Sequence, residues 1–237
     1  MIIAILAGGL ATRLGSLTKA IPKSMLPVAG EPFLGHQLRQ LASTGITRVH
    51  LCLGYLCEPI LDYVGDGRRF GVEVTSTLEG ATLMGTGGAL ALARPFLGDF
   101  FGVMYGDSYL PVDVSRLADQ ARQIGTTGVM TVWHNRNRHD RSNLTVDGGR
   151  VTFYSADRTD PTRYDWIDYG LSFLKSQALE RIPVDRPSPL SVLWKSLVDE
   201  NQLAALTVTG RFYEIGSVTG YQELHSLAEE GGLPRLS

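Results

Sequence analysis

The chain has 237 residues, of which 43% are hydrophobic, and its 22 Lys and Arg against 24 Asp and Glu give a formal net charge of −2. This length is enough to bury a sizeable core. The charge argues against a general nucleic-acid or anionic-membrane surface, because such surfaces usually carry a clear positive excess. We therefore expect no nucleic acid and no membrane among the partners, and we expect any polyanion to bind at one local site.

Cys52 and Cys57 are the only cysteines, and they are spaced neither as a paired zinc site nor as a disulfide framework. We interpret both as reduced thiols. The apolar run at the amino terminus breaks at Gly8 and has no basic segment before it, unlike a signal peptide or a membrane span. These features predict a soluble, cytoplasmic protein.

In the first half of the chain, segments of strand type alternate with segments of helix type. The expected strands cover residues 2–6, 48–53, 72–76 and 100–105, and the expected helices cover residues 32–43, 58–64 and 83–93. Such alternation predicts a mostly parallel sheet with helices on both faces. Ligands of these sheets bind at the carboxyl ends of the strands.

In the second half, Asp113 is expected to cap a helix over residues 114–123, and an Asp-Gly pair at 147–148 is expected to close a hairpin. The remaining strands are expected at residues 127–133, 144–146, 151–154, 166–174, 203–208 and 211–216, and the remaining helices at residues 190–199 and 218–229. Because no linker, repeat or low-complexity segment interrupts the chain, we expect a single domain over residues 1–237.

The first strand runs directly into a glycine turn. Gly8 and Gly9 allow the backbone to turn tightly and to present bare N–H groups. Thr12, Arg13 and Lys23 then supply a hydroxyl, a five-donor fork and a mobile positive charge, all of which stabilise anionic oxygens. An ordinary turn with two surface cations is the alternative. The spacing matches neither the P-loop nor the dinucleotide fingerprint.

Two carboxylates stand beside glycine at expected strand ends. Asp107 follows Gly106 after the strand at residues 100–105, and Glu214 precedes an Ile-Gly pair. Carboxylate oxygens at such positions suit Mg²⁺, and a structural cap is the alternative for each. His134 and His139 flank a polar loop, and we interpret them as solvated side chains rather than metal ligands.

Several of these motifs together resemble the signature of sugar-1-phosphate nucleotidyltransferases. The matching segments are Leu-Ala-Gly-Gly at residues 6–9, Thr-Arg-Leu at 12–14 and Pro-Lys-x-x-x-Pro-Val at 22–28. Ala11 replaces the usual second glycine before Thr-Arg. The family's Gly-Asp matches Gly106-Asp107, and its late Asp-x-Gly matches Glu214-Ile215-Gly216 with a carboxylate one methylene longer. Within this family, the chain most resembles the heptose-1-phosphate, or mannose-1-phosphate-like, guanylyltransferase branch.

The resemblance implies a Rossmann-like three-layer α/β sandwich with a mostly parallel mixed sheet. Residues 1–110 would form a nucleotide-binding half and residues 111–237 a sugar-phosphate-binding half. The implied reaction joins a nucleoside triphosphate, with GTP favoured, to a sugar 1-phosphate, with heptose 1-phosphate favoured. It gives a nucleotide sugar and pyrophosphate, and Mg²⁺ is the implied cofactor.

The resemblance also assigns site residues. Catalytic roles fall to Arg13, Lys23 and Asp107, and metal binding to Asp107 and Glu214. Nucleotide binding falls to Leu6, Ala7, Gly8, Gly9, Thr12, Arg13, Lys23, Glu79, Gly85, Thr86, Gly87, Gly88 and Asp107, where the glycines from 85 on should open a helix with free backbone donors. Sugar-phosphate binding falls to Gly106, Arg158, Asp168, Tyr169, Gly170 and Glu214. Arg158 is included because the chain lacks the family's Glu-Lys-Pro.

Three alternatives stay open. A nucleotide-sugar-dependent glycosyltransferase shares this kind of sheet, but it usually needs Asp-x-Asp, and residue 109 is Tyr. A regulatory protein could bind nucleotides in this fold without turnover, which the joint presence of Arg13, Lys23 and Asp107 disfavours. Within the enzyme class, the substrates could be UTP, CTP or dTTP with a hexose 1-phosphate. Assembly into a homo-oligomer also stays open, since no heptad or exposed apolar run marks an interface.

Overall fold

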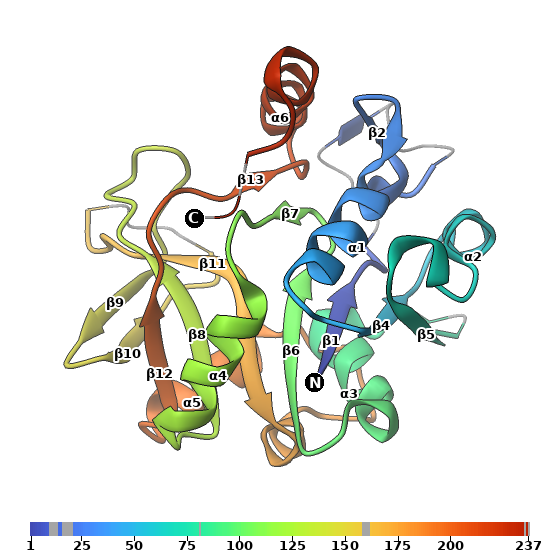
Figure 1. The fold of residues 1–237 in the computed structure, drawn as a ribbon. Coiled ribbons are helices and arrows are strands. Elements are labelled where there is room, and N and C mark those ends of the chain that lie inside the picture. Colours follow the sequence, from blue (N-terminus) through green and yellow to red (C-terminus); the bar gives the residue numbers. More distant parts are fainter. Residues whose placement is uncertain (10–13, 16–20, 81, 158–161, 235, 237) are drawn as a thin grey trace.

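The computed structural model describes residues 1–9, 14–15, 21–80, 82–157, 162–234 and 236. Its main feature is a nine-stranded mixed sheet in the order β5-β4-β1-β6-β11-β8-β12-β10-β9 (Figure 1). These strands are β1 (Ile2–Leu6), β4 (Arg48–Leu53), β5 (Glu73–Leu78), β6 (Phe100–Tyr105), β8 (Gly128–Trp133), β9 (Leu144–Asp147), β10 (Arg150–Tyr154), β11 (Ile167–Lys175) and β12 (Leu203–Thr207).

Helices and short ladders complete the described fold. The α-helices are α1 (Phe33–Ser43), α2 (Glu58–Val64), α3 (Gly85–Leu97), α4 (Val114–Ile124), α5 (Ser191–Asp199) and α6 (Val218–Gly231), and the 3₁₀ turns are Lys23–Met25, Arg68–Phe70 and Ser176–Arg181. Two small ladders pair β2 (Pro27–Val28) with β3 (Glu31–Pro32) and β7 (Ser108–Tyr109) with β13 (Tyr213–Glu214). Most expected elements are confirmed within a few residues, whereas these ladders are new except for part of the strand expected at 211–216.

The two halves of the sheet are built differently. Strands β5, β4, β1 and β6 are parallel, as the alternation in the sequence predicted. Beyond β6, strand β11 runs antiparallel to both of its neighbours, β8 and β12 are parallel, and the hairpin β9–β10 is antiparallel. The expected Asp113 cap is confirmed, because its side chain accepts a hydrogen bond from the Arg116 N–H at 3.0 Å.

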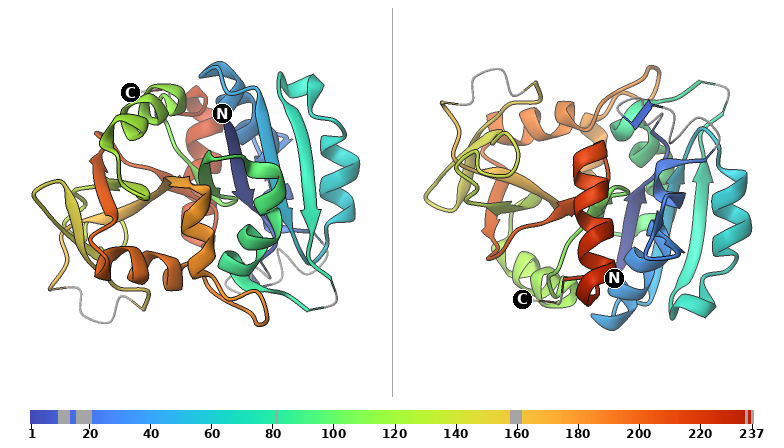
Figure 2. Two further views of the ribbon diagram at one scale, coloured as in Figure 1. Left: turned by 90° about the horizontal axis from the view of Figure 1, so that it is seen from below. Right: turned by 90° about the horizontal axis from the view of Figure 1, so that it is seen from above.

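Helices cover both faces of the sheet (Figure 2). Strand β1 shows why, since Ile3 and Ile5 enter one buried cluster with residues of α1, α2 and α4, whereas Ile2, Ala4 and Leu6 enter a second with α3 and α5. Alternate side chains of a strand point to opposite faces, so a wholly apolar strand requires a core on each side. None of the helices in the described ranges is both long and apolar enough to cross a membrane.

A third, smaller core ties the end of the chain to its beginning. Leu26, Val28 and Phe33 pack with Ile215 and Leu224 of the α6 region. The Tyr221 hydroxyl on α6 also donates to the Pro27 carbonyl oxygen at 2.7 Å. As a result, the segment that follows Lys23 and the segment that carries Glu214 are held against one another, although about 190 residues separate Lys23 from Glu214 in the sequence.

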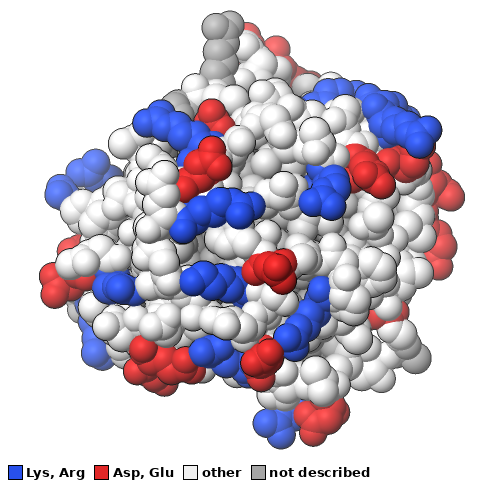
Figure 3. Space-filling view, turned by 60° about the horizontal axis from the view of Figure 1, so that its bottom comes forward, with Lys and Arg blue, Asp and Glu red and all other residues white. Residues whose placement is uncertain are grey.

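The surface agrees with the near-neutral composition on the face shown in Figure 3, where Lys and Arg side chains are interspersed with Asp and Glu. Arg94 pairs with Glu180 at 2.8 Å, and Arg181 pairs with Glu200 at 2.5 Å. On that face, mixed charges of this kind do not make the broad positive field that general polyanion binding needs.

Candidate active site

Two adjoining cavities open where β1 and β6 end and where β11 begins. The smaller has a volume of about 480 Å³ and the larger about 560 Å³. Tyr105 and Asp107, at the end of β6, line both cavities. The carboxyl end of the parallel strands is therefore where the concave surface lies, as expected for an α/β sheet. Asp107 stands at the junction, so one side chain can act on ligands in both cavities.

The wall of the smaller cavity is largely backbone and small side chains. Its lining residues are Leu6, Ala7, Gly8, Gly9, Lys23, Ser24, Cys52, Glu79, Leu83, Gly85, Thr86, Ala89, Tyr105, Gly106 and Asp107. Gly8 is required by close packing, because a Cβ there would lie 2.8 Å from the Gly54 backbone nitrogen and 3.0 Å from Glu79 Oε2. Most of the described residues assigned to the nucleotide thus share one cavity. Gly106, expected on the sugar side, lines this cavity as well.

Glu79 presents a carboxylate at this wall. Its Oε1 accepts a hydrogen bond from the Met84 N–H at 2.6 Å. Burial raises the pKa of the Glu79 carboxyl, and the Met84 N–H opposes this shift by stabilising the charged form. A carboxylate oxygen has more than one lone pair, so Glu79 keeps the capacity to accept hydrogen bonds from a ligand.

The amino terminus of α3 differs from the expectation. The N–H groups of Gly87 and Gly88 donate to the Ser188 carbonyl oxygen, at 2.9 and 3.1 Å. The Thr86 hydroxyl accepts from the Leu190 N–H at 2.9 Å. The prediction of free backbone donors is therefore wrong for Gly87 and Gly88, because a loop distant in sequence caps this helix. Gly85 and Thr86 line the cavity, and the other two glycines do not.

Asp107 and Glu214 come together through the β7–β13 ladder, in which Glu214 pairs with Ser108. A Cβ at Gly216 would lie 2.5 Å from Glu214 Oε2 and 2.8 Å from Asp107 Oδ2. Only glycine therefore leaves the space between the two carboxylates open. Glu214 is held in place by the Gly216 N–H at 2.5 Å and the Ser217 hydroxyl at 2.6 Å.

This pair of carboxylates fits a magnesium site of the kind found with phosphate ligands. Within the described ranges, no group of three or more His, Cys, Asp or Glu side chains could hold a metal ion. Mg²⁺ is usually held by one or two carboxylates, with phosphate and water oxygens completing its shell. In addition, a cation already sits at this position, because Lys23 Nζ lies 2.5 Å from Asp107 Oδ2.

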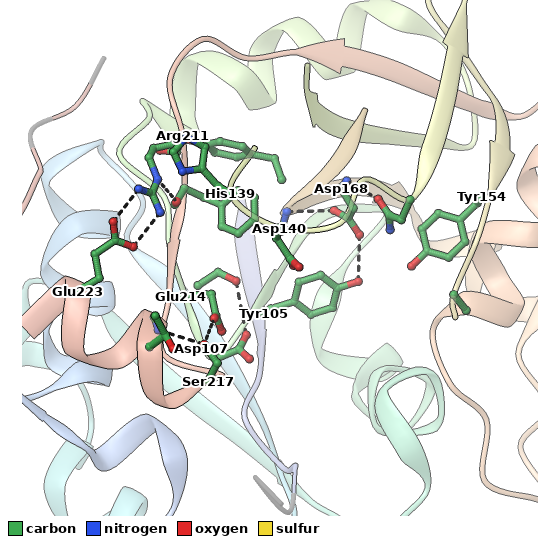
Figure 4. Close-up of a pocket in the computed structure, with 18 residues that line it drawn as sticks. Tyr105, Asp107, His139, Asp140, Tyr154, Asp168, Arg211, Glu214, Ser217 and Glu223 are labelled. Atoms are coloured by element: carbon green, nitrogen blue, oxygen red, sulfur yellow. Dashed lines mark hydrogen bonds and ion pairs between the residues drawn. The ribbon is translucent and has the colours of Figure 1, made fainter. Parts of the chain in front are cut away.

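The larger cavity is walled by polar and aromatic side chains from distant segments (Figure 4). Its lining residues are Tyr105, Asp107, Ser108, His139, Asp140, Asn143, Tyr154, Ala156, Asp168, Tyr169, Gly170, Arg211, Phe212, Glu214, Ser217, Thr219, Gly220 and Glu223. Asp107, Glu214 and Ser217 lie near one another, Arg211, Glu223 and His139 form a second group, and Asp168 and Tyr154 lie away from both. His139 is exposed in its loop, as expected from the sequence, and its ring stacks on that of Trp133 with the centroids 5.5 Å apart.

Asp168 is only 8% exposed and is held by several donors. Its Oδ1 accepts from the Gly170 N–H at 2.9 Å, and its Oδ2 accepts from the Tyr105 hydroxyl at 3.1 Å. Burial and the negative charge of Asp168 raise the pKa of Tyr105 well above its usual range, so this hydroxyl stays a donor. Tyr169, expected to face the sugar, is fully buried, and its hydroxyl donates to the Arg211 carbonyl oxygen at 3.3 Å.

The sequence did not single out Arg211 or Glu223. The Arg211 guanidinium donates to both Glu223 carboxylate oxygens, at 2.7 and 2.9 Å, and lies over the Tyr213 ring at 4.6 Å. Among the lining residues that the structure describes, Arg211 is the only Lys or Arg in the larger cavity. Thr12, Arg13 and Arg158, which the sequence also implicated, lie outside the described residues.

Comparison with known proteins shows which proteins this chain resembles in sequence and in fold. A model of the nucleotidyl transferase family matches residues 3–143. The chain is 27% identical over 234 residues to a UTP–glucose-1-phosphate uridylyltransferase of Synechocystis. This alignment covers 92% of the chain and 60% of that protein. It is also 38% identical over 113 residues to a D-glycero-α-D-manno-heptose 1-phosphate guanylyltransferase of Campylobacter jejuni. That alignment covers 48% of the chain and 50% of the relative.

The chain therefore matches only part of the length of both curated relatives. A solved structure of HddC from Yersinia pseudotuberculosis superimposes with a TM-score of 0.78 at 24% identity, over 95% of this chain and 98% of that one. This likeness concerns the fold. Together with the sheet order, it confirms the expected Rossmann-like α/β sandwich with helices on both faces of a mixed sheet.

Proposed function

Since the chain belongs to the nucleotidyl transferase family, we propose that it joins a nucleoside triphosphate to a sugar 1-phosphate and releases pyrophosphate. The observation that carries this proposal is the pair of adjoining cavities that meet at Asp107. The smaller, glycine-lined cavity suits a nucleotide, and the larger, polar cavity suits a polyhydroxylated sugar. Their shared wall is where the two phosphate groups would have to meet.

The proposed reaction is an in-line displacement at the α-phosphorus of the triphosphate. An oxygen of the sugar phosphate forms a new bond to that phosphorus, and the bond to the bridging oxygen of the β-phosphate breaks, so that pyrophosphate leaves. The attacking oxygen is already ionised at neutral pH, and no general base is needed. What must be overcome is repulsion between two anions, together with the cost of aligning them.

The residues at the junction would meet these two requirements. Asp107 and Glu214 would hold Mg²⁺, whose charge offsets that of the reacting phosphates. Lys23, which reaches Asp107, would neutralise charge on the triphosphate, and Arg13 is assigned the same task by the family motif. The bare backbone at Gly8 and Gly9 allows the phosphates to approach closely.

GTP is the triphosphate that we favour. Guanine presents two adjacent N–H donors on its pairing edge, and the carboxylate of Glu79 can accept both. Uracil and thymine instead present one N–H between two carbonyl oxygens. A carboxylate repels these carbonyl oxygens, because both groups carry negative charge. Glu79 lies in the wall of the smaller cavity, anchored by the Met84 N–H. A curated relative named as a uridylyltransferase keeps UTP as the second candidate.

For the sugar we favour a heptose 1-phosphate, which the Campylobacter jejuni relative is named for. Asp168 would accept hydrogen bonds from sugar hydroxyls, while Tyr169 and Gly170 shape the wall beside it. Arg211 would add a cation for the sugar phosphate, alongside Arg158, which the sequence suggested for that role. The volume of about 560 Å³ leaves room for a sugar larger than a hexose.

The test is pyrophosphate release by the purified chain with Mg²⁺, each of the four ribonucleoside triphosphates or dTTP, and a panel of hexose and heptose 1-phosphates. We expect one pair of substrates to turn over fastest, and Asp107→Ala to lower its rate by about a hundredfold or more. Asp119→Ala, an exposed change on α4, is the control. Tight nucleotide binding without turnover for any pair would contradict the proposal and favour a regulatory protein.

A further inference from the structure

A glutamine on α1 contacts the turn that carries Asp107. Gln37 is fully buried, at 0% exposure. Its side-chain Nε2 donates to the carbonyl oxygens of Tyr105, at 3.1 Å, and of Ser108, at 2.8 Å. These two carbonyl groups stand on either side of Gly106 and Asp107 in the chain. One side chain therefore ties together both ends of the turn between β6 and β7.

The two hydrogen bonds explain why a polar side chain lies at this buried position. Both groups that face the amide are carbonyl oxygens, which only accept hydrogen bonds, so the NH₂ group of Gln37 must point at them. Its Oε1 is buried and has no hydrogen-bond partner within the described part of the chain. A buried acceptor without a partner destabilises the fold. An apolar side chain would fill the space without that cost, so the bonds to the turn are what the glutamine contributes.

The turn is also held by backbone groups on its other sides. The Gly106 N–H donates to the Leu6 carbonyl oxygen at the end of β1, at 3.0 Å. The Ile215 N–H, just after β13, donates to the Asp107 carbonyl oxygen at 2.9 Å. Three elements thus fix the path of the chain through Asp107. Of these three contacts, the one from Gln37 is made by a side chain, so a substitution can remove it and leave the other two in place.

The position of this turn decides where the Asp107 carboxylate points. A Cβ at Gly216 would lie 2.8 Å from Asp107 Oδ2 and 2.5 Å from Glu214 Oε2, so both oxygens face one small space. Mg²⁺ requires nearly octahedral geometry, with its ligand oxygens about 2.1 Å away. A small shift of the turn changes the spacing of the two carboxylates, and the metal is then held less tightly. Side chains that orient metal ligands typically raise metal affinity by about tenfold to hundredfold.

We propose that Gln37 is a positioning residue for the metal site, and that it holds residues 105–108 so that Asp107 faces Glu214 at the spacing Mg²⁺ needs. This inference rests on the proposed function. Gln37 is not among the described residues that line either cavity, so it acts only through the turn. Its substitution should therefore weaken the part of nucleotide binding that depends on the metal and spare the part that depends on the glycine-lined wall.

The test separates these two parts of nucleotide binding by calorimetry. The purified chain is titrated with the triphosphate that it binds most tightly, which is GTP in our proposal, once with Mg²⁺ and once with a chelator. The ratio of the two dissociation constants measures how much the metal strengthens binding. We expect Gln37→Met to bind the triphosphate about tenfold more weakly than the unmodified chain with Mg²⁺, and within about twofold of it with the chelator.

Gln40→Met is the matched control. Gln40 lies on the same helix, is 8% exposed, and its Nε2 donates to the Leu110 carbonyl oxygen, beyond the turn. Both substitutions remove a buried amide, so both should lower the melting temperature, whereas Gln40→Met should keep the full effect of Mg²⁺. Gln37→Glu changes the shape of the side chain least. Burial favours the protonated form of the carboxyl that it introduces, which donates one of the two hydrogen bonds, so a smaller loss than that of Gln37→Met is expected.

Two results would overturn the proposal. One is an equal effect of Mg²⁺ on the unmodified chain and both Gln37 variants, and the other is an equal loss in Gln37→Met and Gln40→Met. Asp107→Ala, measured alongside, separates this inference from the proposed function. If Asp107→Ala abolishes the effect of Mg²⁺ and the Gln37 variants keep it, only the role of Gln37 is wrong. If Asp107→Ala keeps it as well, the metal role proposed for Asp107 fails too.

Discussion

The two cavities differ in what forms their walls. The smaller one is built from the turn at Gly8 and Gly9 and from other short side chains, on the parallel half of the sheet. The larger one is built mostly from polar and aromatic side chains of distant segments, such as Asp168 on β11, which runs antiparallel to β6, and Arg211, which precedes β13. A surface that binds a ligand through its backbone needs glycines at fixed positions, so it can be recognised as a motif in the sequence. A surface that binds through side chains from distant segments has no such motif and can be recognised only in the folded chain.

Among substitutions that should affect ligand binding in one cavity only, we expect the largest effect at Gly8. Gly8→Ala would place a Cβ 2.8 Å from the Gly54 backbone nitrogen, so the turn must move. Overpacking of this kind costs about 1–3 kcal/mol, which corresponds to a loss of nucleotide affinity of roughly fivefold to 150-fold if the turn shifts.

Gly9→Ala is the matched control, because a Cβ at Gly9 would meet no atom within 4 Å. Calorimetric titration with GTP of both variants makes the comparison. Equal affinities for Gly8→Ala and Gly9→Ala would break the link between close packing and nucleotide binding.

A smaller effect is expected at Glu79, which together with Asp107 supplies the carboxylates among the described residues that line the smaller cavity. Glu79→Gln replaces one acceptor oxygen by a donor, so we expect GTP affinity to fall about tenfold while UTP affinity changes little. The ratio of kcat/KM for GTP and UTP is the measurement. A variant that loses both triphosphates alike would show that Glu79 supports the cavity and does not read the base.

The smallest effect is expected at the Arg211–Glu223 pair of the larger cavity. Arg211→Lys keeps the charge and loses the bidentate contact with Glu223, and the pair is partly exposed, at 25% and 42%. We expect the KM for the sugar 1-phosphate to rise about threefold, with the KM for the triphosphate unchanged, since partly exposed pairs contribute little. Initial rates with each substrate varied in turn test this. A rise in the KM for the triphosphate alone would contradict the assignment of Arg211 to the sugar phosphate.

Sequence reasoning reached the fold because the large elements have clear periodicity and the first four sheet strands alternate with helices. It missed β7, which is two residues long and forms only because the distant β13 pairs with it, and it missed the two-residue strands β2 and β3, which pair with each other. It also read Gly87 and Gly88 as free donors, since nothing near residue 188 indicates that this loop caps α3.

The same division holds within the site. Asp107 and Glu214 could be found from the glycines beside them, because a close approach between two carboxylates requires a residue without a side chain. The ion pair of Lys23 with Asp107 spans 84 positions, and that of Arg211 with Glu223 depends on how α6 returns over the sheet. Neither spacing follows a local rule, so only the folded chain shows them.

The most direct test of the proposed reaction follows the oxygens of the sugar phosphate. A sugar 1-phosphate with ¹⁸O at its three non-bridging positions is incubated with GTP, Mg²⁺ and the protein, and the products are analysed by ³¹P nuclear magnetic resonance and mass spectrometry. Attack on the α-phosphorus predicts that all three labelled oxygens appear in the nucleotide sugar, one of them bridging the two phosphorus atoms, and that the pyrophosphate is unlabelled. Labelled orthophosphate, or a product without the label, would contradict the proposed use of the two cavities.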